Sequence, residues 1–567
     1  MRKNDFEVIV IGGGVLGCFA AREMTRQGLG VCVLEKNADI CAGITKANTA
    51  VIYPGYDTLP GSLKTRFGVK ASREMAELCA ELSVPFRRCG SLFTACGPVS
   101  EGIVRERYEL GTANGVEGLE ILSGDEARRL EPNLSPAVTS ALFAPTAGTL
   151  DPWAFGIAAA ENAAANGAVF VTGERARGVA YDAAAGVYSI TAPASGTTYT
   201  ARAVINAAGL YTDEVFASYG APGFCIVPSK NEYIVLDTYA AEAVNGIVFQ
   251  ERESGKGVTI VPTVGGNVLV AGTDLGGTIA KTDTATTAAG QRHIEELARE
   301  ILPALPLDTK IRSFAGVRPG IYPVAAGGWP HPDKTRTVNE FTILEDEDSP
   351  CLITFAGIKT PGLTCAREIG AYAAELVCRR LGRIAGQAAA GFDPRRRVNL
   401  AGRAAAAPGG TGETIVCRCR GVTEGAVRAA ARSMAGAVNV NGVKRRTEAG
   451  LGRCQGGYCL QNIIEILADE LGVPAADIKL EEDDAAIVYG GQGGEAPPRA
   501  VPRDSRRGGY GEYADVAILG SGPAGLSAAV AAKECGARRV LILERLSEPG
   551  GLLPQCVHRG FGARIFG

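Results

Sequence analysis

The chain has 567 residues, with 58 basic and 61 acidic side chains and a formal net charge of −3. This length allows roughly three or four domains. Because the charges balance and no long basic run occurs, nucleic acid is excluded as the expected partner. No apolar stretch is long enough to span a bilayer, and sixteen cysteines in so long a chain do not form a disulfide scaffold.

The N-terminal segment predicts a strand, a glycine turn, a helix and a second strand. Gly12, Gly14 and Gly17 form a G-x-G-x-x-G turn, which lets backbone N–H groups approach a pyrophosphate at a helix N-terminus. The second strand ends in Glu35, 21 residues after Gly14, where a carboxylate can accept ribose hydroxyls. Together these features predict an α/β fold with a Rossmann-like sheet that binds an adenine dinucleotide.

Helical and strand patterns alternate from this unit to about residue 395. The expected elements are helices at 62–83 and 153–166, strands at 168–172 and 201–209, alternating strands over 223–275, and a strand, turn and helix at 353–377. The alternating strands are typical of an antiparallel sheet on which a substrate can lie. The last turn places a second helix N-terminus where it can face a ligand.

Several motifs in this region carry a resemblance to a known superfamily. They are TKANTAVIYPGYD, SLFTA, LEPNLSP, APTAGTLDPW, INAAGLYTDE, SFAGVRP and FAGIKTPGLT. With the opening unit, they make residues 1–395 resemble the FAD-dependent oxidoreductases of the D-amino-acid oxidase and glycerol-3-phosphate dehydrogenase superfamily. The resemblance implies FAD-binding parts at about 1–85, 145–220 and 310–385, with substrate-sheet parts at about 86–144 and 221–309.

The resemblance also implies which residues contact the FAD. They are Gly12, Gly14, Gly17, Glu35, Lys36, Thr45, Lys46, Ala47, Asn48, Thr49, Ala208, Gly209, Gly357, Lys359, Gly362, Leu363 and Thr364. A turn role is the alternative for Asn48.

Hydride transfer to a flavin requires a group that anchors the substrate and, for an alcohol, a base. Arg318, expected in a glycine-proline turn after a strand at 311–317, is the best anchor for a carboxylate or phosphate. Tyr53 stands where many relatives carry His, so Tyr53 or Lys359 is the candidate base. Lys230 and Tyr233 are further candidates. Because an amine donor needs no base, amino or imino acids are a second possible substrate class.

Four cysteines form a compact pattern after a linker predicted at 396–412. Cys417 and Cys419 make C-x-C, and Cys454 and Cys459 make C-x4-C. Residues 413–475 resemble the bacterioferritin-associated-ferredoxin-like [2Fe–2S] domain appended to glycerol-3-phosphate dehydrogenase A-type subunits, a small helical domain. Four thiolates fit such a cluster, with zinc or bare thiols as alternatives.

A second glycine motif follows another linker, predicted at 476–512. Gly520, Gly522 and Gly525 lie between two predicted strands, and the second strand ends in Glu544. Residues 513–567 resemble the start of an FAD- or NAD-binding domain of the pyridine nucleotide–disulfide oxidoreductases. We expect a truncated βαβ unit that binds no dinucleotide tightly, from an incomplete reading frame or as a tail completed by a partner chain.

The sequence therefore predicts a cytoplasmic FAD and [2Fe–2S] dehydrogenase of a small anionic substrate, glycerol 3-phosphate or a 2-hydroxy acid. Its electrons would pass to flavin or iron–sulfur partner subunits, with quinone as one acceptor, and partners could hold it at the inner face of the membrane. The enzymatic alternative is an opine- or proline-type dehydrogenase. The non-enzymatic alternative is a redox sensor.

Overall fold

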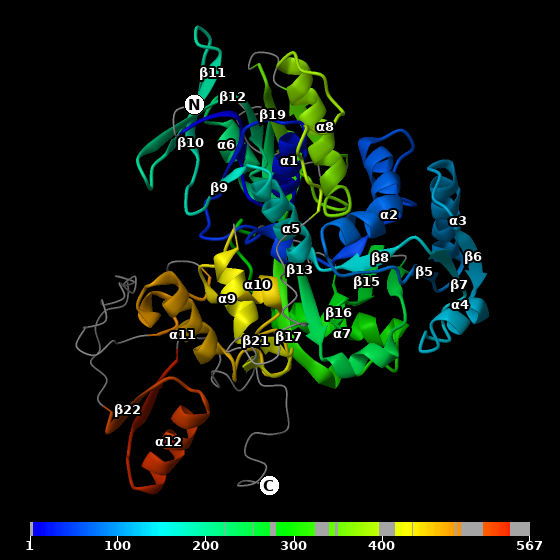
Figure 1. The fold of residues 1–567 in the computed structure, drawn as a ribbon. Helices are drawn as coiled ribbons and strands as arrows, with labels where there is room; N and C mark the ends of the chain where they lie inside the picture. Colours follow the sequence, from blue (N-terminus) through cyan, green and yellow to red (C-terminus); the bar gives the residue numbers. More distant parts are fainter. Residues whose placement is uncertain are drawn as a thin grey trace.

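The computed structural model describes ten stretches of the chain. They are residues 4–220, 223–252, 255–272, 279–323, 340–345, 350–395, 414–433, 435–481, 485–488 and 514–544. Figure 1 shows a large N-terminal body, a cysteine module (yellow and orange) beside it, and a small C-terminal unit (red) standing apart. The predicted linker at 396–412 lies outside the described residues.

The first sheet carries the opening glycine turn. Its strands are β1 (Asp5–Ile11), β2 (Val31–Leu34), β9 (Val169–Val171), β10 (Arg177–Asp182), β11 (Val187–Ala192), β12 (Thr197–Asn206), β18 (Thr342–Glu345) and β19 (Leu352–Ala356). β19, β12, β1, β2 and β9 pair in parallel, whereas β10, β11 and β18 add antiparallel strands. The uninterrupted apolar run of β1 is buried on both faces, as a central parallel strand requires.

Helices cover this sheet. They are α1 (Val15–Arg26), α2 (Leu63–Glu81), α5 (Pro152–Ala165), α6 (Thr212–Phe216) and α8 (Ala366–Arg380). α1 packs between α5 and α8. Gly370 lies so close to Phe19 that a Cβ there would come within 2.8 Å of the Phe19 carbonyl oxygen. The expected helices at 62–83 and 153–166 are confirmed to within about two residues at each end.

The second sheet faces the first across a cavity. In spatial order its strands are β17 (Lys310–Pro323), β13 (Phe224–Leu236), β16 (Val268–Ala271), β15 (Gly255–Pro262), β14 (Ile247–Arg252), β5 (Ser91–Ala95), β7 (Ser140–Ala144) and β6 (Glu120–Ser123). All neighbours are antiparallel except β14 and β5. Because side chains alternate, Ile234 packs under helix α7 (Ala288–Ile301), while Tyr233 lies on the opposite face.

Shorter elements complete the N-terminal body. Helices α3 (Pro98–Ala113) and α4 (Gly124–Leu130) pack at the β5–β7–β6 end of the second sheet. A small sheet of β3 (Val51–Ile52), β8 (Gly148–Leu150) and β4 (Phe86–Arg87) lies next to it.

The prediction that Arg318 lies in a glycine-proline turn is wrong, because β17 runs unbroken through it. Pro319 lies opposite Pro228 of β13. β17 is the edge strand among the described strands, and β16 pairs only with Tyr233–Leu236 of β13. Neither proline therefore needs to donate an N–H to a neighbouring strand, and the strand tolerates both.

The predicted FAD-binding part at 310–385 also starts too early. Residues 310–323 form β17, which pairs with β13 along its whole length and so belongs to the substrate sheet. The strand is assigned wrongly from sequence because its partner lies about 85 residues earlier in the chain, beyond the reach of any local pattern.

The cysteine module is a small helical unit. Its elements are β20 (Ile415–Cys417), β21 (Val422–Thr423), α9 (Glu424–Arg432), α10 (Val440–Thr447) and α11 (Leu460–Leu471). The prediction that a linker starts at residue 476 is wrong. Ile478, Ile487 and Val488 pack on the module core, and the carbonyl of Lys479 accepts a hydrogen bond from the Val440 N–H. The rest of that predicted linker, 489–513, lies outside the described residues.

A buried ion cluster joins this module to the N-terminal body. The Asp39 carboxylate lies 2.7 Å from Arg445 Nη2 and 2.8 Å from Arg446 Nη1, and all three side chains are at most 2 % exposed. Arg445 also pairs with Glu481 at 2.6 Å. Burial raises the pKa of Asp39, but the two guanidinium groups outweigh it and hold that pKa below its usual value.

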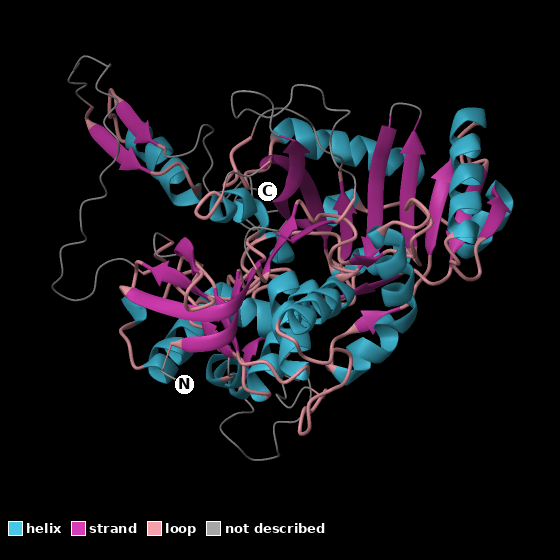
Figure 2. Ribbon diagram, turned by 90° about the horizontal axis from the view of Figure 1, so that it is seen from above, coloured by secondary structure: helices cyan, strands magenta, loops and turns pink. Residues whose placement is uncertain are grey.

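The C-terminal unit has the expected strand, helix and strand: β22 (Val516–Leu519), α12 (Pro523–Glu534) and β23 (Val540–Leu543). The two strands pair in parallel. No residue of α12 is buried, and the unit stands away from the other domains in both views (Figures 1 and 2). Glu544 accepts a hydrogen bond from the Ser521 N–H at 2.8 Å. Of the helices described, none is long and apolar enough to cross a membrane.

The ion cluster predicts that Asp39→Asn destabilises the docked module by about 3–5 kcal/mol, because two buried arginines lose their counter-charge. Chemical unfolding, followed by the loss of helical circular dichroism, measures the effect. Asp125→Asn is the matched control, since Asp125 pairs with Arg128 but is 85 % exposed, and its unfolding midpoint should barely move. Equal shifts in the two variants would contradict the prediction.

Candidate functional site

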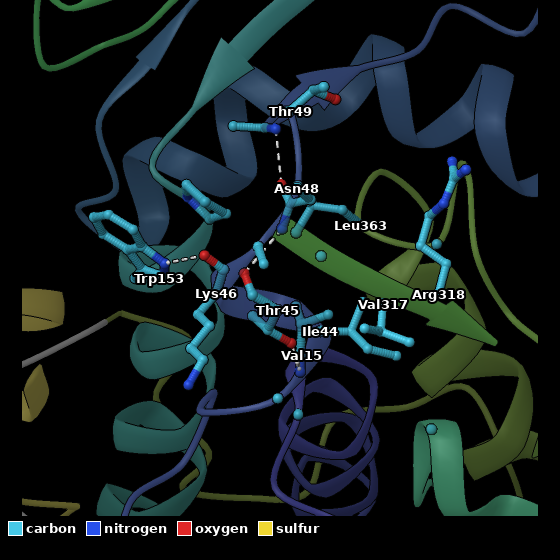
Figure 3. Close-up of a pocket in the computed structure, with 18 of the residues that line it drawn as sticks. Val15, Ile44, Thr45, Lys46, Asn48, Thr49, Trp153, Val317, Arg318 and Leu363 are labelled. Atoms are coloured by element: carbon cyan, nitrogen blue, oxygen red, sulfur yellow. Dashed lines mark hydrogen bonds between the residues drawn. The ribbon is translucent and has the colours of Figure 1, made fainter. Parts of the chain in front are cut away.

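One large cavity, of about 1530 Å³, lies between the two sheets. The glycine turn after β1, the loop at 42–50 and the turn at 358–364 form one side, and β13 and β17 form another. The third side comes from the cysteine module, through Lys444, Leu451 and Gln455 among others. Figure 3 shows the wall built from the N-terminal body.

The glycine turn has the geometry that a pyrophosphate needs. Gly12 has a φ of +108°, and a Cβ on Gly17 would collide with the Gly12 carbonyl, so both glycines are needed for the turn itself. A Cβ on Gly14 would only meet Thr45 Oγ1 at 3.5 Å, an ordinary contact. Gly14 therefore leaves space above the N-terminus of α1, where the phosphates of FAD would lie.

Glu35 is buried at the end of β2 and braces the same turn. Its carboxylate accepts the Gly13 N–H at 2.7 Å and both the backbone and side-chain N–H groups of Asn37 at 2.8 Å. Burial raises its pKa, while the bonds from Asn37 and Gly13 lower it. Lys36 lies 4.5 Å from the ring centroid of Tyr211, so its ammonium faces an aromatic wall.

The loop at 44–50 is held by its own side chains and by two helices. Thr45 Oγ1 accepts the Val15 N–H at 3.0 Å, and the Trp153 indole donates to the Lys46 carbonyl at 3.2 Å (Figure 3). Asn48 donates to the Thr45 carbonyl at 2.9 Å and accepts the Ala50 N–H at 2.7 Å. Asn48 thus shapes the turn, which is the alternative that the sequence left open.

Most of the predicted FAD-contacting residues line this cavity. The exceptions are Gly17 and Gly357, which lie behind the wall. Gly357 has a φ of +62°, and a Cβ there would come within 2.5 Å of Ile321 Cβ. These two glycines allow close backbone packing, so their roles are structural.

The predicted substrate residues Tyr53, Arg318, Lys359 and Tyr233 share the cavity. Arg318 donates through Nη2 to the Asn231 side chain, and its buried Nε has no hydrogen-bond partner among the described residues. Lys230 is not among the residues that line the cavity, and its ammonium donates to Asp283 at 2.8 Å and to the Ala285 carbonyl at 3.0 Å. Alternation along β13 separates Lys230 from Tyr233.

The environment of Tyr53 limits what it can do. Burial raises the pKa of Tyr53 to about 12, although a hydrogen bond with Thr49 and the charge of Arg318 act against this. The phenol therefore keeps its proton at neutral pH and can donate a hydrogen bond. A phenol in this state is a hydrogen-bond donor rather than a base.

The four cysteines of the module meet in two pairs. The sulfurs of Cys419 and Cys454 are 3.5 Å apart. Cys417 and Cys459 share a hydrogen bond, which is the main cause that lowers the pKa of Cys417, to about 5. Within the described residues no three metal-binding side chains surround one point. Two pairs instead fit a centre with two irons, each held by two thiolates.

Residues beside the cysteines attach the module to the cavity. Arg420 follows Cys419 and donates to the Gly265 carbonyl at 2.6 Å. Gln455 follows Cys454 and accepts from Arg312 of β17 at 3.2 Å. The cluster loops and the cavity wall are therefore continuous. These contacts between domains were not predictable from the sequence, because no local pattern marks them.

The fold and the site define an FAD-dependent oxidoreductase with an appended iron–sulfur domain. Residues 7–376 match the family described as FAD dependent oxidoreductase, and the chain belongs to that family. Residues 415–469 match the BFD-like [2Fe-2S] binding domain, and residues 515–557 match an FAD binding domain. The cofactors of the protein are FAD and a [2Fe–2S] cluster.

Relatives span most of the chain. A glycerol 3-phosphate dehydrogenase of Caloramator mitchellensis is 36 % identical over 497 residues, which cover 86 % of this chain and 98 % of the relative. An anaerobic glycerol-3-phosphate dehydrogenase subunit A1 of Haloferax volcanii is 26 % identical, over 82 % of this chain and 83 % of that protein. The fold is that of L-alpha-glycerophosphate oxidase from Mycoplasma pneumoniae, with a TM-score of 0.62, 24 % identity and coverage of 69 % and 98 %.

The open space at Gly14 predicts that Gly14→Val abolishes FAD binding without unfolding the chain, because the side chain would fill the phosphate position. The flavin-to-protein ratio after purification measures this. Gly522→Val is the matched control: Gly522 caps α12 with nearly the same backbone angles, and its variant should keep a full flavin content. A Gly14→Val protein that retains its full content of FAD would refute the assignment of this turn as the phosphate site.

The environment of Lys444 predicts that the stability of the apoprotein depends on pH. Burial is the main cause that lowers its pKa, from 10.5 to about 7, and the charge of Arg312 adds to it. Below pH 7 the folded apoprotein carries the full cost of this charge, on the order of 5 kcal/mol, and the cost vanishes as pH rises through 10.5. Lys444→Met should therefore stabilise the apoprotein at pH 7 in chemical unfolding.

The stabilisation by Lys444→Met should disappear near pH 10. Lys533→Met, on the exposed face of α12, should show no effect at either pH. A gain for Lys444→Met that is the same at both pH values would mean that packing, rather than charge, is responsible.

Proposed function

We propose that the protein is a dehydrogenase that oxidises glycerol 3-phosphate and passes the electrons through its [2Fe–2S] cluster to a partner. The observation that carries the proposal is Arg318, a half-buried guanidinium in the FAD cavity, whose one hydrogen-bond partner among the described residues is the neutral Asn231. Such a group favours an anionic substrate beside the flavin. The names of the relatives that span most of the chain support a phosphate ester as that substrate.

We propose separate roles in the reaction for three side chains of the cavity. Arg318 would hold the phosphate, and Tyr53, as a neutral phenol, would donate a hydrogen bond to the substrate. When bound, FAD supplies the acceptor for the hydride of the secondary alcohol. We propose that Lys359, in its neutral amine form, accepts the hydroxyl proton as the hydride leaves, since the turn at 358–364 lies on the cavity wall.

We propose that electrons leave the reduced flavin through the cysteine module. Leu451 and Gln455 line the cavity and flank Cys454, so the cluster lies against the same wall. A hydride delivers two electrons, whereas such a cluster carries one at a time, which suits transfer to a partner subunit. We propose that this partner is a flavin or iron–sulfur protein, which could hold the enzyme at the membrane.

An anaerobic substrate screen tests this function. Glycerol 3-phosphate, added to the holoprotein, should bleach the flavin and then reduce the cluster, while L-2-hydroxyglutarate and L-proline should act much more slowly. Cys454→Ser should keep the flavin bleaching and lose the cluster signal, and the exposed Cys535→Ser should keep both. Fastest bleaching by proline would overturn the substrate, and rapid peroxide formation in air would indicate an oxidase.

A further inference from the structure

We propose that Arg107 of α3 is a second anion-binding side chain of the cavity, so that the substrate is a dianion held by both Arg107 and Arg318. Arg107 lines the cavity, and its guanidinium carbon lies 5.0 Å from the ring centroid of Phe93. Its buried Nε has no hydrogen-bond partner among the described residues. The inference rests on the proposed function only in placing a small anionic substrate in this cavity.

The backbone around Arg107 is firmly fixed. Gly111, one turn later in α3, lies so close to Tyr56 that a Cβ would come within 2.8 Å of the Tyr56 Cβ. Asn114, which caps α3, donates to the carbonyls of Gly55 at 2.9 Å and Thr58 at 2.7 Å. Helix α3 is therefore bonded to the loop that follows Tyr53, and Arg107 is held at a constant distance from the rest of the site.

Each of the two arginines interacts electrostatically with a tyrosine of the cavity. The charge of Arg107 acts to lower the pKa of Tyr56, and the charge of Arg318 acts to lower the pKa of Tyr53. Burial raises the pKa of both phenols, so both remain neutral donors. Asp57 also lines the cavity but is exposed and forms no ion pair with either arginine.

The charge of this wall identifies the class of substrate. A half-buried guanidinium whose Nε is buried without a partner is costly, so a cavity with two of them favours a ligand with two negative charges. A monocarboxylate can satisfy one planar guanidinium in a bidentate pair and would leave the other unpaired. A phosphate monoester or a dicarboxylate can satisfy both. Both ligands carry two negative charges, and the experiment below distinguishes a phosphate monoester from a dicarboxylate.

The test is a binding titration with anions that cannot be oxidised. Inorganic phosphate, malonate and acetate are added to the oxidised holoprotein at pH 8, and the change in the flavin spectrum gives each Kd. We expect Arg107→Met to raise the Kd of the dianion that binds, phosphate or malonate, by about tenfold or more, and that of acetate far less. Arg107→Lys should recover part of the loss.

Arg105→Met is the matched control, because Arg105 lies on the same helix but is 67 % exposed and pairs with Glu101. Its Kd values should equal those of the wild type. Full flavin content and unchanged circular dichroism show that each variant folds. If Arg107→Met binds phosphate and malonate as the wild type does, or if neither dianion binds the wild type, the proposal is overturned.

These outcomes distinguish the proposed anion site at Arg107 from the proposed oxidation of glycerol 3-phosphate. If glycerol 3-phosphate fails to bleach the wild-type flavin but the dianion titrations depend on Arg107, the substrate assignment fails and the anion site stands. If glycerol 3-phosphate is oxidised and Arg107→Met leaves its KM unchanged, the function stands and the anion site fails. With Arg107 as an anchor, KM should rise about tenfold while kcat changes little.

Discussion

The buried carboxylate of Asp39 is the contact on which the arrangement of the protein depends. It stands five residues after the end of β2 and binds two arginines from a helix some 400 residues later in the chain. A buried charge is stable only while its partners stay in place. The loop that follows the nucleotide-binding strand and the iron–sulfur module are thus held in one orientation.

This orientation makes the active cavity a product of three parts of the chain. The first sheet supplies the nucleotide-binding turn, the second sheet supplies Arg318, and the module supplies the wall beside the cysteines. The nucleotide-binding turn, Arg318 and the loops that carry the cysteines therefore border one cavity.

The parts that were predictable from sequence are those encoded by neighbouring residues. The glycine turn, the acid after the second strand and the paired cysteine motifs each lie in a short segment, because backbone geometry and thiolate spacing are local properties. Arg318 was predicted to be a site residue, but the strand was predicted to end at residue 317, because Pro319 and Gly320 are typical of a turn, whereas β17 continues to Pro323. Arg107, Asn231 and the partners of Asp39 depend on contacts between distant segments, and no local pattern indicates them.

Glu35 also has a structural role, because it holds the glycine turn in place. Its carboxylate bonds the backbone of the glycine turn, and Glu544 makes the same bond to Ser521 in the C-terminal unit. The acid at this position therefore holds the backbone of the glycine turn in both units. Replacing it to change nucleotide preference would also loosen the turn.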